Sequence, residues 1–451
     1  MALRPCTFLG LHALFYHLVS IPPAGTTRIV FTRLEIHDWR QFGHVDIHFH
    51  PQLTILTGAN ASGKTTLLNI LSRHFGWEIP LVRTKSRWRR RWLAGYLKRF
   101  WESPSDLPSE DDPELAPARP VGSISYEDGR RAELRDPGEG QPTYKLELVG
   151  RPAVKGLHIP SHRPLAIYAE IPNVPIRPIT KAEAFTNYVQ AMQQRHISGR
   201  GGQSATFHIK QTLVSLAALG YGNDRMPRQP ELVETLEGFE AVLRRTLPAT
   251  LGFRDFQFDL PDVFLTTDTG PVSLDAISGG LASVLNISWQ IYMYSPLNEP
   301  YVVTIDEPEN HLHPAMQRTL LADLLSAFPL VQFVVATHSP FIISSAAQSR
   351  VFVLDFDRDV PLPQVFSQEL ENADRSGTAN EILRDVLGLP SSMPVWAEQT
   401  LDEIVQRYSR EPLTPDRLAA LRAELRERGL DNVITDALRE VLIVTSRGEA
   451  G

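Results

Sequence analysis

Residues 58–65 have the pattern G-x-x-x-x-G-K-[ST], which constrains the fold more than any other stretch of the chain. The apolar segment 53–57 before them predicts a buried strand, and the leucine-containing segment 65–75 predicts the helix that follows. In a strand–loop–helix of this kind, glycines let backbone N–H groups close around phosphates, and the helix N-terminus adds positive partial charge. The chain is therefore expected to be an α/β protein with a P-loop NTPase core.

The phosphate loop assigns nucleotide contacts to its own residues. Lys64 is predicted to reach the β- and γ-phosphates, and the Thr65 hydroxyl is predicted to hold Mg²⁺. ATP and Mg²⁺ are therefore the expected cofactors. The predicted nucleotide-binding residues of the loop are Gly58, Asn60, Ala61, Ser62, Gly63, Lys64, Thr65 and Thr66.

A second apolar run, residues 301–305, ends in two carboxylates, Asp306 and Glu307. A buried parallel strand carries such a run and delivers polar residues at its carboxyl end. Asp306 is predicted to bind Mg²⁺, directly or through water, and Glu307 to polarise the attacking water as general base. The pair predicts Mg²⁺-dependent ATP hydrolysis.

Two further segments complete the expected site. Residues 331–336 predict another buried strand, and His338 follows it, where its side chain could touch the γ-phosphate. Ser278, Gly279 and Gly280 open a helical pattern, and small residues at a helix N-terminus allow close backbone approach to an anion.

The order of these motifs resembles the ABC-type (cassette) ATPases of the RecF, SMC and OLD group, which are often described as AAA-family ATPases. The run Ile-Asp-Glu-Pro-Glu-Asn-His-Leu-His-Pro (305–314) is similar to that of the OLD-like branch, and Ala-Thr-His-Ser-Pro follows at 336–340. The opening hairpin, 28–49, also looks familial. Members of the group include ATPases of bacterial anti-phage systems that pair with a separate nuclease.

The resemblance implies an ABC-type fold with an antiparallel β insertion, a helical signature lobe and a C-terminal helical tail. It implies a homodimer, or a higher assembly, with two composite sites. The Ser278–Gly280 signature of one subunit would cap the nucleotide held by the other subunit's P-loop. Glu309, Asn310 and His311 match the D-loop, which crosses the dimer interface.

Some contacts implied by the resemblance have alternatives. A residue of the first hairpin contacts adenine or its phosphates, and we assign stacking to Trp39 and phosphate pairing to Arg40; a Trp that only fills the hairpin edge is equally consistent. A polar residue, usually glutamine, links the Mg²⁺ site to the helical lobe in this group. Arg163 or His162 is expected to take a phosphate-facing role here.

Composition limits the partners. A net charge of −7 on 451 residues provides no overall basic field for nucleic acid, so DNA binding needs a local patch. The basic, aromatic segment 85–101, from Lys85 through Arg99, is a candidate for DNA; a solvated amphipathic helix or a protein-binding one is the alternative. The single Cys6 excludes an internal disulfide framework and agrees with a cytoplasmic location.

The chain is expected to have three parts. Residues 1–27 form an N-terminal extension, which superficially resembles a signal peptide but is too short and too rich in histidine for a membrane span. Residues 28–360 form the ATPase domain, with an inserted basic helix, flexible loop and β segment at about 77–160 and a helical lobe at about 180–250. Residues 361–451 form a C-terminal helical appendage for oligomerisation or partner docking. No membrane partner is expected.

Smaller elements follow from local patterns. Strands are expected at 121–126, 130–134, 143–149, 165–171, 253–259 and 263–267, with 350–355 as the last strand of the sheet. Helices are expected at 181–195, 206–219, 230–247, 378–387, 396–408, 415–428 and 432–444. Alternating Asp355, Asp357 and Asp359 suggest a nuclease metal site, but the helical remainder of the chain does not favour one.

Three functions compete. The favoured one is an ATPase that dimerises around ATP and gates an effector nuclease or a nucleic acid, in anti-phage defence. A RecF-type DNA-repair clamp that acts directly on DNA is the first alternative. A transporter ATPase subunit is the second, and the long separation of P-loop and carboxylates counts against it.

Overall fold

The computed structural model describes residues 30–82, 118–138, 142–163, 168–198, 203–222, 224–296, 299–357, 364–371, 377–388, 394–409, 414–430 and 434. The chain divides into two compact units, Met1–Asn372 and Ala373–Gly451. The expected N-terminal extension, the basic segment from Lys85 to Arg99 and the helix at 432–444 lie outside the described residues, except for 434.

The first unit is built on an eleven-stranded sheet whose strand order is β8-β6-β5-β1-β2-β16-β15-β3-β14-β13-β9. The strands β15, β3, β14, β13 and β9 run parallel to one another. Every residue of β3, β13 and β14 is buried, as their apolar runs predict. Their bounds are β3 Leu53–Gly58, β9 Gly156–Ile159, β13 Tyr301–Asp306, β14 Val331–Ala336 and β15 Arg350–Asp357.

The rest of the sheet is mainly antiparallel. The expected β insertion is not a separate sheet, because β5 pairs with β1 of the opening hairpin and thereby extends the main sheet. Only the short strands β4 (Leu81–Val82) and β7 (Thr143–Tyr144) form a pair of their own. The other bounds are β1 Phe31–Trp39, β2 Phe42–His48, β5 Arg119–Tyr126, β6 Arg131–Asp136 and β8 Glu147–Val149.

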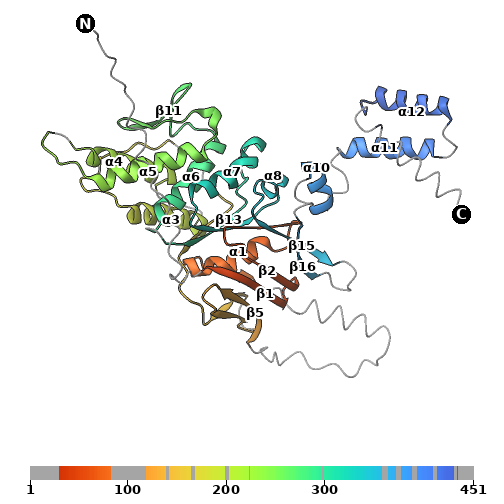
Figure 1. Cartoon of the computed structure of the whole chain (residues 1–451), viewed down its shortest axis with the longest axis horizontal. Coiled ribbons are helices and arrows are strands. Elements are labelled where there is room, and N and C mark those ends of the chain that lie inside the picture. Colours follow the sequence, from red (N-terminus) through yellow and green to blue (C-terminus); the bar gives the residue numbers. More distant parts are fainter. Residues whose placement is uncertain are drawn as a thin grey trace, which may run out of the picture. The chain divides into compact units, whose positions relative to one another are not determined.

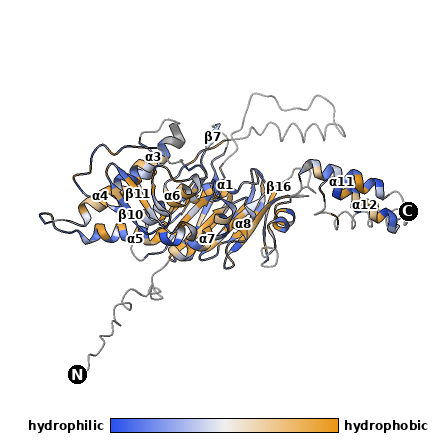
Figure 2. Cartoon of the chain, turned by 90° about the horizontal axis from the view of Figure 1, so that it is seen from above, coloured by the Kyte–Doolittle hydropathy of each residue, from blue (hydrophilic) through white to orange (hydrophobic). Residues whose placement is uncertain are grey.

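Helix α1, Lys64–Ser72, lies between the antiparallel and parallel parts of this sheet (Figure 1). Its leucines, among them Leu67 and Leu71, share one hydrophobic core with residues of β1, β2, β5 and β6 on one side and with Val302 and Val334 on the other. Figure 2 shows hydrophobic (orange) and hydrophilic (blue) residues mixed along the helices and strands. Because α1 is enclosed on both sides, its first turn, which completes the phosphate loop, has a fixed position. A 3₁₀ turn, Arg73–Phe75, ends the segment.

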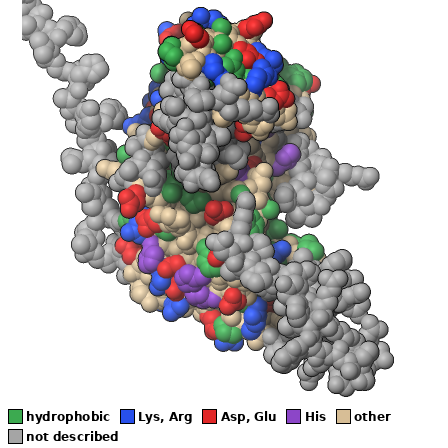
Figure 3. Space-filling view, turned by 90° about the vertical axis from the view of Figure 1, so that its right-hand side faces the viewer, with side chains coloured by type: hydrophobic (Ala, Val, Ile, Leu, Met, Phe, Trp, Pro, Cys, Tyr) green, Lys and Arg blue, Asp and Glu red, His purple; other side chains and the backbone are tan. Residues whose placement is uncertain are grey.

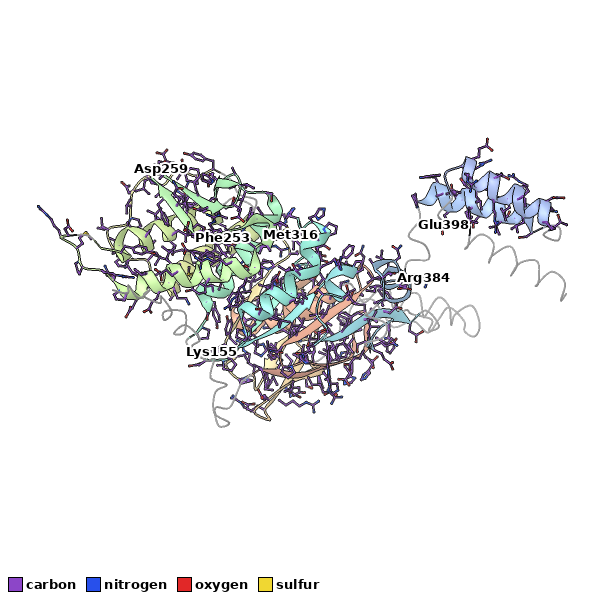
Figure 4. All side chains as sticks on the ribbon, turned by 45° about the horizontal axis from the view of Figure 1, so that its top comes forward. Lys155, Phe253, Asp259, Met316, Arg384 and Glu398 are labelled. Carbon is purple, nitrogen blue, oxygen red and sulfur yellow. The ribbon has the colours of Figure 1, made fainter. Side chains whose placement is uncertain are left out.

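A helical lobe stands beside the sheet and carries the predicted signature. Its helices are α3 Lys181–Ser198, α4 Ala205–Gly220, α5 Pro230–Thr246 and α6 Gly279–Tyr294, with a 3₁₀ turn at Ala249–Leu251. A three-stranded sheet leads into α6 through β10 Phe256–Asp259, β11 Asp262–Thr267 and β12 Gly270–Ser273. Asp259 marks the outer end of this sheet and Phe253 packs within the lobe (Figure 4).

Two expected strands differ from the structure. The described part of 165–171, residues 168–171, is not a strand, and the edge position of the parallel sheet is taken by β9 instead. Strand β15 is not the last, because β16 (Gln364–Glu369) follows and pairs with both β15 and β2. The sheet therefore extends past residue 360, and the expected helical appendage begins later than predicted. Two helices, α7 Pro314–Ala327 and α8 Pro340–Ile343, follow β13 and β14.

The second unit is helical where it is described. Its elements are α10 Ala379–Glu381, a π-helical turn Ile382–Val386, α11 Val395–Tyr408 and α12 Pro415–Glu427. Helices α11 and α12 bury a small core that includes Leu401, Ile404, Leu421 and Leu425. This unit therefore has a hydrophobic core of its own.

Candidate functional site

The phosphate loop requires glycine at two places for two separate reasons. Gly58 has φ +128°, and a Cβ there would lie 2.1 Å from the carbonyl oxygen of Leu354 in the adjacent strand β15. Gly63 has φ +99°, and a Cβ there would lie 2.4 Å from the ring of Phe42 in the opening hairpin. Ala61 also has a positive φ, +64°. The sequence motif therefore reflects the tight packing of the loop between β15 and the first hairpin.

Lys64 is turned into its own loop. Its Nζ donates to the carbonyl oxygens of Gly58 and Ala59, both at 2.9 Å, and the residue is buried. Burial lowers the pKa of Lys64 to about 8, while the nearby Glu307 and Asp306 oppose that shift. In the part of the chain that the structure describes, this buried ammonium is hydrogen-bonded to carbonyl oxygens, which phosphate oxygens can replace.

Thr65 and Asp306 meet although they are far apart in sequence. The Thr65 hydroxyl donates to Asp306 Oδ2 at 3.0 Å. Asp306 is buried at the carboxyl end of β13, and burial raises its pKa to about 6 although the Thr65 hydrogen bond lowers it. A hydroxyl and a carboxylate oxygen at this distance fit the oxygen preference of Mg²⁺. No cluster of three or more His, Cys, Asp or Glu that could hold a metal occurs among the described residues.

Glu307 and His338 face each other at the ends of neighbouring strands. His338 Nε2 lies 3.7 Å from Glu307 Oε1, and Asn310 Nδ2 donates to Glu307 Oε2 at 3.0 Å. Burial and the charge of Lys64 lower the pKa of His338, against the attraction of Glu307. Strand β14 separates β3 from β13, so His338 stands between the phosphate loop and the carboxylates. The predicted base and the predicted γ-phosphate residue are thus brought together.

Glu309 has a role that the motif did not suggest. Its Oε1 accepts from the Thr337 hydroxyl at 2.6 Å and from the backbone N–H groups of His338 and Ser339 at 2.8 and 3.2 Å. The carboxylate thereby fixes the loop that carries His338 within the same chain. His311, in the same expected D-loop, is exposed and has φ +70°.

The predicted signature residues begin α6. Ser278 is its N-cap, and its hydroxyl accepts from the Leu281 N–H at 3.4 Å. A Cβ at Gly280 would lie 3.0 Å from the His311 carbonyl oxygen, so this helix start packs against the expected D-loop. Ser278 is exposed and Gly279 is half-buried. The helix N-terminus is therefore accessible, and its role across a dimer stays a prediction.

The stacking assigned to Trp39 is wrong. Its side chain is only 1% exposed and packs parallel to Phe42, with ring centroids 5.9 Å apart. Trp39 therefore fills the hairpin core, as the alternative interpretation held. Arg40 occupies the turn itself with φ +56°, and its guanidinium lies 5.8 Å from the Trp39 ring centroid. Its phosphate contact stays a prediction.

Arg163 also differs from its expected role. Its guanidinium does not face the phosphate loop but is buried, donating to Ser283 of α6 and to the backbone carbonyls of Asp306 and Glu307. His162 is exposed. The family resemblance was the sequence signal that drew attention to Arg163. Its partners come from distant segments and could not be predicted from the sequence.

The loop fits a nucleotide phosphate. Ser62 Oγ is buried and has no hydrogen-bond partner among the described residues, and Ser62 lies between Ala61 and Gly63, which both have positive φ. Asn60 and Ala61 are exposed, and Thr66 is half-buried on the first turn of α1. An orphaned hydroxyl, a buried ammonium and a helix N-terminus at one place have the chemistry of an anion-binding site.

Two family models match the chain, and their positions agree with this site. One, described as "AAA domain", matches residues 33–127, and the other, "AAA domain, putative AbiEii toxin, Type IV TA system", matches residues 249–344. The first spans the phosphate loop and the second spans the signature, the carboxylates and His338.

Curated relatives match over shorter stretches. A Septu protein PtuA from Bacillus thuringiensis is 26% identical over 34% of this chain and 41% of the relative. The Retron Vc95 probable ATPase from Vibrio cholerae serotype O1 biovar El Tor is 36% identical over 14% of this chain and 12% of the relative. The chain thus matches less than half the length of these relatives. Among solved structures, the SMC head domain from Thermotoga maritima aligns with 76% of this chain and 99% of its own, at 13% identity and a TM-score of 0.37.

In its site and in its two AAA-domain matches, the chain resembles P-loop ATPases. Within that class, the chain is similar over short stretches to a Septu protein PtuA and to a retron probable ATPase. In the described part of the chain, no helix combines the length and apolarity needed to cross a bilayer. Figure 3 shows a face of the molecule on which acidic, basic and histidine side chains are mixed, without a broad patch of one sign.

Proposed function

We propose that this chain binds ATP with Mg²⁺ and hydrolyses it at two composite sites in a homodimer. One observation carries the proposal: three segments distant in sequence bring Lys64, Thr65, Asp306, Glu307 and His338 together at the carboxyl ends of parallel strands. Parallel strands present their carboxyl ends together, and polar residues gathered there form the binding site of such folds.

Each residue has a role that follows from its surroundings. When ATP binds, the Lys64 ammonium exchanges its hydrogen bonds to the Gly58 and Ala59 carbonyl oxygens for hydrogen bonds to phosphate oxygens. The negative charge of the phosphate stabilises the buried ammonium better than neutral carbonyls do. Thr65 and Asp306 would hold Mg²⁺, which when bound neutralises phosphate charge. Glu307, held by Asn310, accepts the proton of the attacking water, and His338 is placed to donate a hydrogen bond to the γ-phosphate.

The exposed start of α6 supports the proposed dimer. Ser278 and Gly279 present a helix N-terminus that is free to approach a phosphate of a second subunit. ATP would hold two subunits together, and hydrolysis would remove the γ-phosphate contacts and release them. By analogy with the defence ATPases it resembles, the cytoplasmic dimer would gate an effector, with a nuclease as the leading candidate.

Two substitutions test this function. Lys64→Ala should reduce ATP affinity by at least about tenfold, and Glu307→Gln should leave binding intact, stop turnover and accumulate a dimer with ATP and Mg²⁺. The exposed pair Lys155 and Glu299, which hydrogen-bond each other, supply matched controls as Lys155→Ala and Glu299→Gln (Figure 4 labels Lys155). Size-exclusion chromatography with light scattering would disprove the dimer if Glu307→Gln stayed monomeric with ATP and Mg²⁺.

ATP turnover measured with and without DNA distinguishes gating of an effector from direct action on DNA. Duplex DNA should leave ATP hydrolysis unchanged within about twofold, because the net charge is −7. A strong stimulation that disappears on charge reversal of Arg89, Arg90 and Arg91 would instead support a RecF-type clamp.

A further inference from the structure

The outward face of the opening hairpin carries two histidines directly opposite each other. His37 of β1 and His44 of β2 are Cα partners in the antiparallel ladder. Directly opposite cross-strand residues have Cβ atoms about 5 Å apart, so their side chains can reach a common ligand. The Nδ1 atoms of the two imidazoles lie 3.0 Å apart, and both residues are exposed. The two ring nitrogens are therefore close together and open to solvent.

The hairpin holds this pair in a fixed place. Ile36 and Val45, the neighbouring partners in the ladder, are fully buried in the core on the opposite face. Strand β1 also pairs with β5, and β2 also pairs with β16, so both strands are internal to the main sheet. The backbone beneath the two imidazoles is therefore fixed, and only side-chain rotation is needed to bind a ligand. Such preorganisation lowers the cost of binding.

The charges on this face are already paired. Arg33 Nη2 lies 2.7 Å from Asp46 Oδ2, and His48 Nε2 lies 3.6 Å from Asp46 Oδ1. In the described part of the chain, the ring nitrogens of His37 and His44 contact each other and form no ion pair. Because Arg33 is neutralised by its carboxylate partner, it does not oppose the approach of a cation to the histidines.

The spacing of the two nitrogens fits neighbouring ligands of one metal ion. Imidazole–metal bonds are about 2.0–2.1 Å long. Two such bonds at a right angle place their nitrogens about 2.9 Å apart, whereas a tetrahedral angle places them about 3.3–3.4 Å apart. The observed 3.0 Å thus matches adjacent positions of a square-planar or tetragonal ion. Nitrogen ligands in that geometry favour Ni²⁺ or Cu²⁺.

We propose that His37 and His44 bind one divalent transition-metal ion, of the kind represented by Ni²⁺ and Cu²⁺, which crosslinks β1 to β2. The two imidazoles supply two ligands and water supplies the others, because the described residues offer no cluster of three protein ligands. Mg²⁺ and Ca²⁺ prefer oxygen ligands and should not compete. Metal binding at this site requires neither ATP nor a second subunit.

Isothermal titration calorimetry with NiCl₂ tests the site, on the full chain without nucleotide or polyhistidine tag. His37→Ala and His44→Ala should each weaken the tightest Ni²⁺ binding by at least about tenfold, because each removes one of the two protein ligands. His48→Ala is the matched control and should stay within about twofold, since His48 is exposed on the same face of β2 but lies beside Asp46. A wild type that does not bind Ni²⁺, an unchanged affinity in either variant, or an equal loss in His48→Ala would overturn the proposal.

Copper spectroscopy identifies the ligands directly. Electron paramagnetic resonance of the chain with one equivalent of Cu²⁺ should show coupling to two imidazole nitrogens in the wild type. The coupling should fall to fewer nitrogens in His37→Ala and in His44→Ala. The same spectrum in the wild type and in both variants would mean that copper binds elsewhere, and would overturn the proposal.

The crosslink should also stabilise the chain. Ni²⁺ at about 100 times its Kd should raise the unfolding temperature of the wild type by about 3 °C. Neither His37→Ala nor His44→Ala should gain from Ni²⁺, and without metal both should unfold with the wild type, because substitutions at exposed positions change stability little. An equal gain in either variant would place the stabilising ion elsewhere and overturn the crosslink.

Discussion

Asp306 illustrates at the scale of one residue how burial prepares a site for a cation. Its carboxylate is buried and, among the described residues, accepts one side-chain donor, the Thr65 hydroxyl. Burial raises its pKa to about 6. A folded pKa above the unfolded value contributes stability that is present below about pH 4 and lost as pH rises through about 6. At neutral pH the ionised Asp306 therefore weakens the nucleotide-free fold.

Asp306→Asn should consequently stabilise the nucleotide-free protein at pH 8. The gain should be on the order of 2 kcal/mol, because each pKa unit corresponds to ~1.4 kcal/mol, and it should shrink at pH 5. Urea unfolding at the two pH values measures it. ATP with Mg²⁺ should raise the unfolding midpoint of the wild type but not of the variant.

The control for this prediction is Asp259→Asn, at the exposed outer end of β10 (Figure 4), which should change little at either pH. An Asp306→Asn variant that is less stable than the wild type at both pH values would show that the Thr65 hydrogen bond outweighs the buried charge.

Strands β3 and β15 pack so closely at the start of the phosphate loop that their contact requires a glycine. Gly58 ends β3 so close to Leu354 that any side chain would meet a backbone oxygen, which cannot rotate away. Gly129, in the turn between β5 and β6, also has a positive φ, +83°, but has open space around it. The two glycines share the backbone requirement and differ in packing.

Gly58→Ala should therefore destabilise the protein by about 1–3 kcal/mol more than Gly129→Ala, because overpacking adds to the shared backbone strain. It should also weaken ATP binding, since a displacement of Gly58 from Leu354 would move the start of the phosphate loop. Denaturant titration and nucleotide binding measure the two effects. Equal destabilisation by both substitutions would mean that the motif glycine serves only backbone conformation.

The whole molecule consists of two units with separate hydrophobic cores. Leu421 is fully buried between α11 and α12, in the core of the second unit. Every candidate residue for ATP and Mg²⁺ lies in the first unit. The stability of the second unit should thus be separable from nucleotide binding.

Leu421→Ala should destabilise the second unit by about 2–5 kcal/mol, as large-to-small core substitutions do. ATP affinity should stay within about twofold of the wild type. Hydrogen exchange would show faster exchange confined to residues after 372. Faster exchange that spread into β3 or β13 would contradict the independence of the two cores.

Much of the candidate site was accessible from sequence because its motifs are local. The phosphate loop, the carboxylate pair and His338 each sit at the end of a short apolar run, and buried parallel strands produce such runs. The pairing of Thr65 with Asp306 followed from the rule that parallel strands end at one edge. The strands β9 and β16 were not predicted, because edge and closing strands are selected by long-range pairing and carry weak local patterns.

The amino-acid sequence alone determined the class of protein. The glycine-rich turn with its lysine, and the aspartate–glutamate pair, are each formed by neighbouring residues, so their chemistry can be recognised without the fold. Only the tertiary structure decided that Trp39 is core, that Glu309 anchors the His338 loop and that Arg163 joins α6 to Glu307. The reason is physical: the environment of a side chain is set by segments that meet only after folding, and a buried Trp or Arg looks the same in sequence as an exposed one.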